Sequence, residues 1–177
     1  MNMVKGLLAS VVLSLIFLVP PAAKATQAGG GYSRQFLKNT DIEQYEIFAR
    51  EPLPYKTILG DNCLVSSDVE IGLAIIRDSH VDDSQIGRFS LMPQLSFNPS
   101  DRFQFFAGLG TGFMVGETKF TDHDLGGAFF LAAKLGLRFF FGEGWGVEYA
   151  YYHQSNGNIY EHNASLNMQQ LAMFFTF

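Results

Sequence analysis

The stretch FFLAAKLGLRFFF, residues 129–141, alternates between two kinds of side chain. Its odd-numbered positions are apolar throughout, whereas its even-numbered positions include Lys134, Gly136 and Arg138. A side-chain period of two is typical of a β-strand whose two faces meet different surroundings. The stretch therefore predicts a strand with one continuous apolar face.

The same alternation recurs in VEIGLAII (69–76) and RFSLMPQLSF (88–97), and more loosely in QYEIFAR (44–50) and RFQFFAGLGTGFM (102–114). One face of these stretches is apolar and rich in Phe, of which the 177-residue chain has 18. The other face mixes small residues with charges of both signs, as expected of a narrow interior that side chains fill. Its charged residues are Glu46, Arg50, Asp68, Glu70, Arg88, Arg102, Lys134, Arg138 and Glu148.

Two architectures produce such strands. In a soluble sandwich or lipocalin-like barrel the apolar face points inward, whereas in an outer-membrane barrel it meets lipid and the interior is polar. The Phe-rich face and the charges of both signs opposite it favour the outer-membrane barrel over the soluble one. The chain also ends at Phe177, preceded at alternate positions by Phe175, Met173 and Leu171, and this ending resembles the C-terminal insertion signal of bacterial outer-membrane barrels. We predict an all-β fold, an eight-stranded antiparallel transmembrane β-barrel of the bacterial outer membrane.

The strand count of eight rests on the alternating segments and on the even number of strands that single-chain bacterial barrels have. Eight strands leave an interior that side chains can fill, so a pore is not expected. With both termini in the periplasm, residues 98–101 and 142–144 form short periplasmic turns, whereas 52–62 is long for such a turn. The predicted outer loops are 78–85, 116–125 and 156–165, and the predicted strands are 28–36, 42–51, 63–77, 86–97, 103–115, 126–141, 145–155 and 166–177.

The N-terminus has the pattern of an export signal. Lys5 precedes the apolar stretch GLLASVVLSLIFLV, and AKA at Ala23–Ala25 matches an A-x-A cleavage site. We predict a signal peptide over residues 1–25, cleaved after Ala25, and a barrel domain over residues 26–177. The net charge of −5 offers no basic stripe for nucleic acid, and no phosphate-loop, dinucleotide or metalloprotease motif is present in the sequence.

A candidate site lies in YYHQS, residues 151–155. Because Glu148 assigns the even-numbered positions of this strand to the interior, His153 and Ser155 continue the lipid-facing row at its outer end. Asn167 faces outward at the outer end of the neighbouring strand. A serine hydroxyl becomes a nucleophile when an adjacent imidazole takes its proton, and a third polar group usually fixes the imidazole tautomer. On the outer wall, the natural substrate would be an amphiphile of the outer leaflet.

Polar residues are also ordinary at the end of a spanning strand, because the membrane interface is wet. Tyr149, Tyr151 and Tyr152 fit the aromatic girdle expected at that height. The spacing alone therefore leaves the catalytic and the interfacial interpretations open.

HQSNG at 153–157, followed by NASLN at 163–167, resembles the signature of the lipid A 3-O-deacylase family, the PagL-type outer-membrane enzymes. The resemblance implies an eight-stranded barrel that acts as a serine esterase on the acyl chain at position 3 of lipid A. It implies that His153 is the base and Ser155 the nucleophile. Asn167 stands where the family's best-known member has a glutamate that orients the histidine. An asparagine carbonyl can accept the same hydrogen bond, but it cannot stabilise an imidazolium by charge.

The resemblance also implies an oxyanion hole. Asn156 and Gly157 match the residues after the nucleophile, whose amides help to form it, and Asn163 matches a turn asparagine that contributes to the same site. Ala164 and Ser165 depart from the family pattern, which has glycine in this turn. We expect no cofactor and no metal for this reaction.

The residues leave alternatives open. Glu161 could supply the third member from the loop, and the barrel could be a non-enzymatic structural or adhesive surface protein. The expected partners are lipid A or lipopolysaccharide as substrate and the outer membrane as environment, with no nucleic acid, while both a monomer and a homodimer are open. A last alternative is a divalent-cation site in the outer loops, at His80, His123 and His162 with Asp78, Asp82, Asp83, Asp122 and Asp124.

Overall fold

The computed structural model of the chain describes residues 26–37, 41–60, 63–78, 85–120, 123–142 and 144–177. The predicted signal peptide, residues 1–25, lies outside the described residues. No helix in the described segments is long and apolar enough to cross a membrane.

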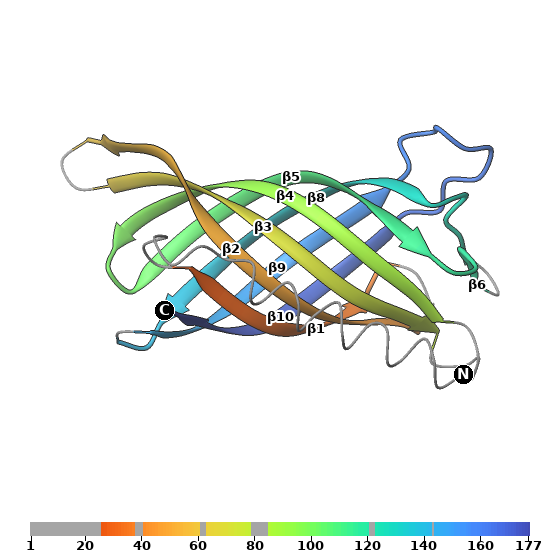
Figure 1. Cartoon of the computed structure of the whole chain (residues 1–177), viewed down its shortest axis with the longest axis horizontal. Helices are drawn as coiled ribbons and strands as arrows, with labels where there is room; N and C mark the ends of the chain where they lie inside the picture. Colours follow the sequence, from red (N-terminus) through yellow and green to blue (C-terminus); the bar gives the residue numbers. More distant parts are fainter. Residues whose placement is uncertain (1–25, 38–40, 61–62, 79–84, 121–122, 143) are drawn as a thin grey trace.

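The eight long strands close into one antiparallel barrel in which β1 pairs with both β2 and β10 (Figure 1). This confirms the predicted fold. A short hairpin of β6 (Lys119–Phe120) and β7 (His123–Asp124) lies between β5 and β8. The barrel strands are β1 (Gln27–Gln35), β2 (Ile42–Leu59), β3 (Cys63–Asp78), β4 (Gln85–Ser100), β5 (Phe103–Val115), β8 (Phe129–Phe140), β9 (Trp145–Ser155) and β10 (Leu166–Thr176).

The long periplasmic turn predicted at 52–62 is wrong, because most of it belongs to strands. β2 continues to Leu59 and pairs there with Cys63 of β3, after a register shift between Pro52 and Lys56. Proline is tolerated in a strand at such a bulge, so the prolines do not end β2. About 9–11 residues of a tilted strand cross a bilayer, whereas β2 has 18. The β2–β3 hairpin therefore projects past the β4–β5 turn (Figure 1).

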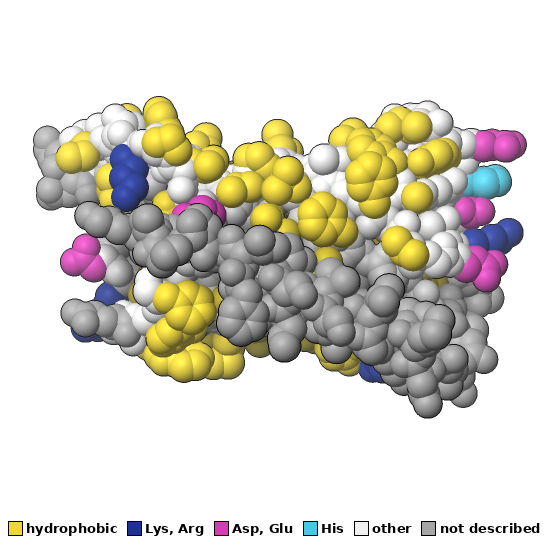
Figure 2. Space-filling model, in the orientation of Figure 1, with side chains coloured by type: hydrophobic (Ala, Val, Ile, Leu, Met, Phe, Trp, Pro, Cys, Tyr) yellow, Lys and Arg dark blue, Asp and Glu magenta, His cyan; other side chains and the backbone are white. Residues whose placement is uncertain are grey.

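The outer wall of the barrel is apolar. Leu131, Leu135 and Leu137 of β8 are 36–61% exposed in the isolated chain, as expected of side chains that meet lipid. Where Figure 2 shows described residues, hydrophobic side chains are spread along the wall, and most of the charged side chains lie toward its two ends. The positions of two residues differ from those predicted. Arg102 is exposed in the turn before β5 rather than inside the barrel, and Tyr152 is 2% exposed inside the barrel rather than part of the aromatic girdle.

Paired charges fill one part of the interior. Glu148 contacts the guanidinium of Arg138 and the ammonium of Lys134 at 2.8 Å each, and it also pairs with Arg50. Arg50 also contacts Glu70 at 2.7 Å. Burying a charge is costly unless an opposite charge and hydrogen bonds compensate for the lost water, and these side chains supply that compensation for one another.

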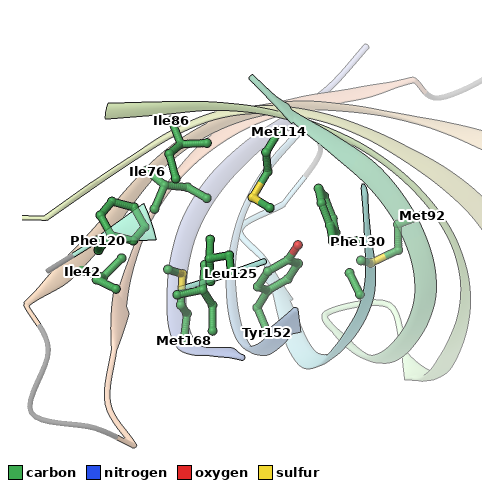
Figure 3. Packing of buried hydrophobic residues seen from close by; sticks show 12 residues of the cluster. Ile42, Ile76, Ile86, Met92, Met114, Phe120, Leu125, Phe130, Tyr152 and Met168 are labelled. Carbon is green, nitrogen blue, oxygen red and sulfur yellow. The ribbon is translucent and has the colours of Figure 1, made fainter. Parts of the chain in front are cut away.

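Apolar side chains fill the interior toward the end of the barrel at which β9 passes into β10, here called the loop end (Figure 3). Phe120 and Leu125 belong to the segment between β5 and β8, and they are only 2% and 3% exposed among the strand residues. The segment therefore folds into the mouth of the barrel. The other members of this cluster are Ile42, Ile76, Ile86, Met92, Met114, Phe130, Ala132, Tyr152, Leu166 and Met168.

Candidate active site

The alternation of β9 sets the direction of the candidate nucleophile and base. Tyr152 and Gln154 are 2% and 1% exposed and point into the barrel. His153 and Ser155 alternate with them, are half-buried, and therefore lie on the outer wall. β9 ends at Ser155, so both side chains lie at the loop end.

Asn167 of β10 lies directly opposite His153 in the ladder between β9 and β10. Nδ1 of His153 is 2.8 Å from Oδ1 of Asn167. An amide oxygen only accepts hydrogen bonds, so in this pair Nδ1 carries the imidazole proton. In the neutral imidazole, Nε2 of His153 then keeps its lone pair, which is the state that a general base requires.

Two further side chains contact the Asn167 amide. The hydroxyl of Tyr151 donates to Oδ1 at 2.7 Å, and Nδ2 donates to Oγ of Ser165 at 3.2 Å. The backbone of Asn167 is held from β1, because its N–H donates to Oε1 of Gln35 at 2.6 Å and its carbonyl accepts from the N–H of Phe36 at 3.2 Å. The asparagine is only 8% exposed, so protein groups rather than bulk water set its orientation.

The sequence pattern placed Tyr151 only in the aromatic girdle and gave Ser165 no part in orienting His153. Tyr151 pairs with Gln169 in the ladder, so it is a diagonal neighbour of Asn167. Such neighbours are within reach of an aromatic side chain, and this geometry is the signal by which Tyr151 could have been found. Ser165 lies in the loop before β10, where alternation gives no guidance.

The residues after the nucleophile form a tight turn. Gly157 and Asn158 have φ of +63° and +62°, and the N–H of Ile159 donates to the carbonyl of Asn156 at 3.2 Å. The N–H of Asn156 donates to Oδ1 of Asn163 at 2.9 Å. The structure thus brings Asn156, Gly157 and Asn163 together beside Ser155, and in this state the Asn156 amide is held by the Asn163 side chain.

The side chain of Asn156 anchors this loop to the segment that fills the barrel mouth. It is 2% exposed, and its Nδ2 donates to the carbonyls of Leu125 and His162 at 3.0 and 2.5 Å. Nearby, Nε2 of His123 lies 2.8 Å from the carbonyl oxygen of Ser165. The loop that carries the candidate oxyanion-hole residues therefore packs against the buried segment between β5 and β8.

Gly126 is required for this close approach. Its φ is +82°, and an added Cβ would lie 1.8 Å from the carbonyl oxygen of His162. Only glycine combines that backbone conformation with that spacing. The anchoring of the loop thus depends on a residue that lies outside the sequence signature.

The alternative site residues are placed differently. Glu161 is exposed in the loop after β9 and His162 is exposed beside it, whereas His123 is buried. In the part of the chain that the structure describes, no group of three or more His, Cys, Asp or Glu side chains is placed to hold a metal ion. Four residues of the expected cation site lie outside the described residues, namely His80, Asp82, Asp83 and Asp122.

The chain is similar to known proteins in sequence pattern and in fold. The family model described as lipid A 3-O-deacylase (PagL) matches residues 66–176, and no curated protein matches the chain. A crystal structure of the outer membrane enzyme PagL shares 14% identity over 85% of this chain and 98% of that chain, with a TM-score of 0.68. Neisserial surface protein A shares 10% over 86% of this chain and 96% of that chain, with a TM-score of 0.57. These two solved structures show the outer-membrane barrel fold.

Proposed function

The chain belongs to the lipid A 3-O-deacylase (PagL) family, and from this premise we propose that Ser155 and His153 carry out its ester hydrolysis. Membership makes the protein an outer-membrane ester hydrolase of lipid A, and it decides against the non-enzymatic barrel. The observation that supports the two catalytic residues is the hydrogen bond between Nδ1 of His153 and Oδ1 of Asn167. It leaves Nε2 as a base on the same outer face as Ser155.

The proposed reaction begins with the Ser155 hydroxyl. Its Oγ attacks the carbonyl carbon of the 3-acyl ester while Nε2 of His153 takes the proton. When the tetrahedral intermediate collapses, the sugar oxygen leaves with that proton and the acyl group stays on Ser155. Water, deprotonated by His153, then attacks the acyl-enzyme. The bond between the acyl carbon and Oγ of Ser155 breaks, His153 returns the proton to Oγ, and a 3-hydroxy fatty acid is released. The outward position suits a substrate that is already in the outer leaflet.

The oxyanion would be stabilised by the amides of Asn156 and Gly157 together with the Asn163 side chain. Because the Asn156 N–H now donates to Oδ1 of Asn163, the substrate oxyanion would take the place of that oxygen. Rotation of the Asn163 amide would then present its Nδ2 as a further donor. Such rearrangement on binding is common, since catalytic hydrogen bonds often form fully only in the complex.

Asn167 would act as the third member by orientation alone. Its carbonyl oxygen accepts from Nδ1 of His153 and so selects the tautomer, but it carries no charge to stabilise the imidazolium. Glu161 remains the competing third member. If Asn167 is the third member, substituting Asn167 should lower turnover and substituting Glu161 should not. If Glu161 is the third member, the reverse is expected.

Processing and assembly complete the proposal. Cleavage after Ala25 would leave a mature chain that begins at Thr26, which N-terminal sequencing of the outer-membrane form tests. The barrel closes without an edge strand, so a homodimer would have to pack through its outer wall. Size-exclusion chromatography with light scattering in detergent distinguishes that dimer from a monomer.

Mass spectrometry of lipid A tests the function directly. Lipid A from cells that express the protein should lack one 3-hydroxy acyl chain relative to cells without it. The matched controls are Ser155→Ala and His153→Ala, which should leave lipid A intact while the barrels keep their heat-modified gel mobility. Near-full deacylation by Ser155→Ala would remove the nucleophile assignment.

A further inference from the structure

The side-chain amide of Asn167 has two ends that are not equivalent. With Oδ1 toward His153, the imidazole carries its proton on Nδ1 and Nε2 is a base. With Nδ2 toward His153, Nδ1 would have to accept, the proton would lie on Nε2, and the imidazole could not accept a proton from Ser155. The orientation of one amide thus decides whether the proposed base is in its working tautomer. A carboxylate at the same position has two equivalent acceptors and would present no such choice.

Two hydroxyl groups flank this amide. Tyr151 donates to Oδ1 at 2.7 Å, on the side of His153, and Ser165 accepts from Nδ2 at 3.2 Å, on the far side. A phenol is a stronger donor and a weaker acceptor than an alkyl hydroxyl, because its lone pairs delocalise into the ring. The two hydroxyls therefore favour the same orientation of the amide, with Oδ1 toward Tyr151 and His153.

The residues that carry these hydroxyls make further contacts of their own. The ring of Tyr151 packs edge-on against Phe36, with centroids 5.8 Å apart, and the backbone of Phe36 donates to Asn167. The backbone carbonyl of Ser165 lies 2.8 Å from Nε2 of the buried His123. The ring of Tyr151 and the backbone of Ser165 thus each have a further contact that positions them near the Asn167 amide.

We propose that Tyr151 and Ser165 are positioning residues that hold the Asn167 amide in the orientation that keeps Nε2 of His153 basic. The inference rests on the proposed function, in which His153 is the base. Neither hydroxyl touches the reacting atoms, and both act through Asn167.

The test compares two backgrounds. Tyr151→Phe and Ser165→Ala are each made in the natural chain and in an Asn167→Asp chain, whose side chain has the same shape but two equivalent oxygens. In the natural chain each change should lower turnover by about three- to tenfold, the loss expected of one hydrogen bond. In the Asn167→Asp chain the loss should stay below about twofold, because the tautomer no longer depends on an amide orientation. Tyr149→Phe is the matched control, since it removes a hydroxyl from the same face but lies opposite Leu171.

A second measurement reports the tautomer without relying on turnover. The ¹⁵N shifts of His153 in protein labelled at histidine should show a protonated Nδ1 in the natural chain and a mixture of tautomers in Tyr151→Phe and Ser165→Ala. Equal losses of turnover in both backgrounds, or an unchanged His153 tautomer, would overturn the inference. If the proposed function itself is wrong, the result is a different one, because the Ser155→Ala variant would still hydrolyse lipid A. If the Asn167→Asp chain is inactive, the ¹⁵N spectra of His153 alone test the role of Tyr151 and Ser165.

Discussion

His153 and Asn167 lie directly opposite each other across the β9–β10 ladder, with Nδ1 of the imidazole 2.8 Å from Oδ1 of the amide. The neighbouring pair in the same ladder is Tyr152 and Met168, which are both buried inside the barrel. A slip of one residue would turn that apolar pair toward lipid and His153 toward the interior. The core of the barrel therefore fixes the register that brings the imidazole and the amide together.

The first prediction concerns the support of the loop after β9. Gly126→Ala should lower turnover by about tenfold, because both the left-handed φ and the contact with the His162 carbonyl resist a Cβ. Hydrolysis of lipid A in detergent measures the loss. Gly142→Ala is the control, since Gly142 also has a positive φ of +71° but nothing lies within 4 Å of its added Cβ. Equal activity of the two variants would show that the loop does not need this anchor.

The second prediction concerns the charges inside the barrel. Glu148→Gln should lower the free energy of unfolding by about 3–5 kcal/mol, because three buried cations lose their shared carboxylate. Urea unfolding of the folded barrel in detergent micelles measures the change. Glu43→Gln is the matched control, because the pair of Glu43 with Arg77 at 3.0 Å is partly exposed. Its loss should cost about 1 kcal/mol or less, and a similar cost for both variants would contradict the prediction.

The third prediction concerns sidedness. With Cys63 replaced by serine, Ile159→Cys in the loop after β9 should react on whole cells with an impermeant thiol reagent, and Pro99→Cys near the β4–β5 turn should not. Both positions are exposed in the structure, so only their side of the membrane distinguishes them. The reverse pattern would invert the topology and move the site away from outer-leaflet lipid.

The sequence predicted the parts of the molecule that repeat. Alternation identifies which residues of β8 and β9 face lipid and which face the interior, since lipid and a filled interior select opposite side chains at every second position. Alternation also placed His153, Ser155 and Asn167 on one outer face. Alternation gave wrong predictions at the ends of strands. The predicted strand 42–51 was too short, because a bulge after Pro52 carries β2 onward. Arg102 was assigned to the interior, although β5 begins only at Phe103.

The contacts that loop residues make at the candidate site could not be predicted from periodicity. Ser165 reaches Asn167 from a loop, and Asn156 is anchored by a backbone carbonyl of Leu125. Such contacts depend on how the loops after β5 and β9 pack together. No repeat in the sequence encodes that packing, which is set by tertiary structure.

The last prediction concerns Asn167 itself. If it selects the His153 tautomer, Asn167→Ala should lower turnover by about one to two orders of magnitude, because the imidazole loses the acceptor for Nδ1. Asn167→Glu should at least preserve turnover, since a carboxylate accepts the same hydrogen bond and also stabilises the imidazolium that forms as Ser155 attacks. The added charge at the membrane interface should cost about 1 kcal/mol or less of stability. The rate of release of 3-hydroxy fatty acid in detergent compares both variants with the natural chain.

Glu161→Ala is the control for Asn167, because the exposed loop carboxylate is the competing third member. An inactive Glu161→Ala beside an unaffected Asn167→Ala would transfer the role to the loop, whereas the reverse result would leave the tautomer of His153 under the control of β10.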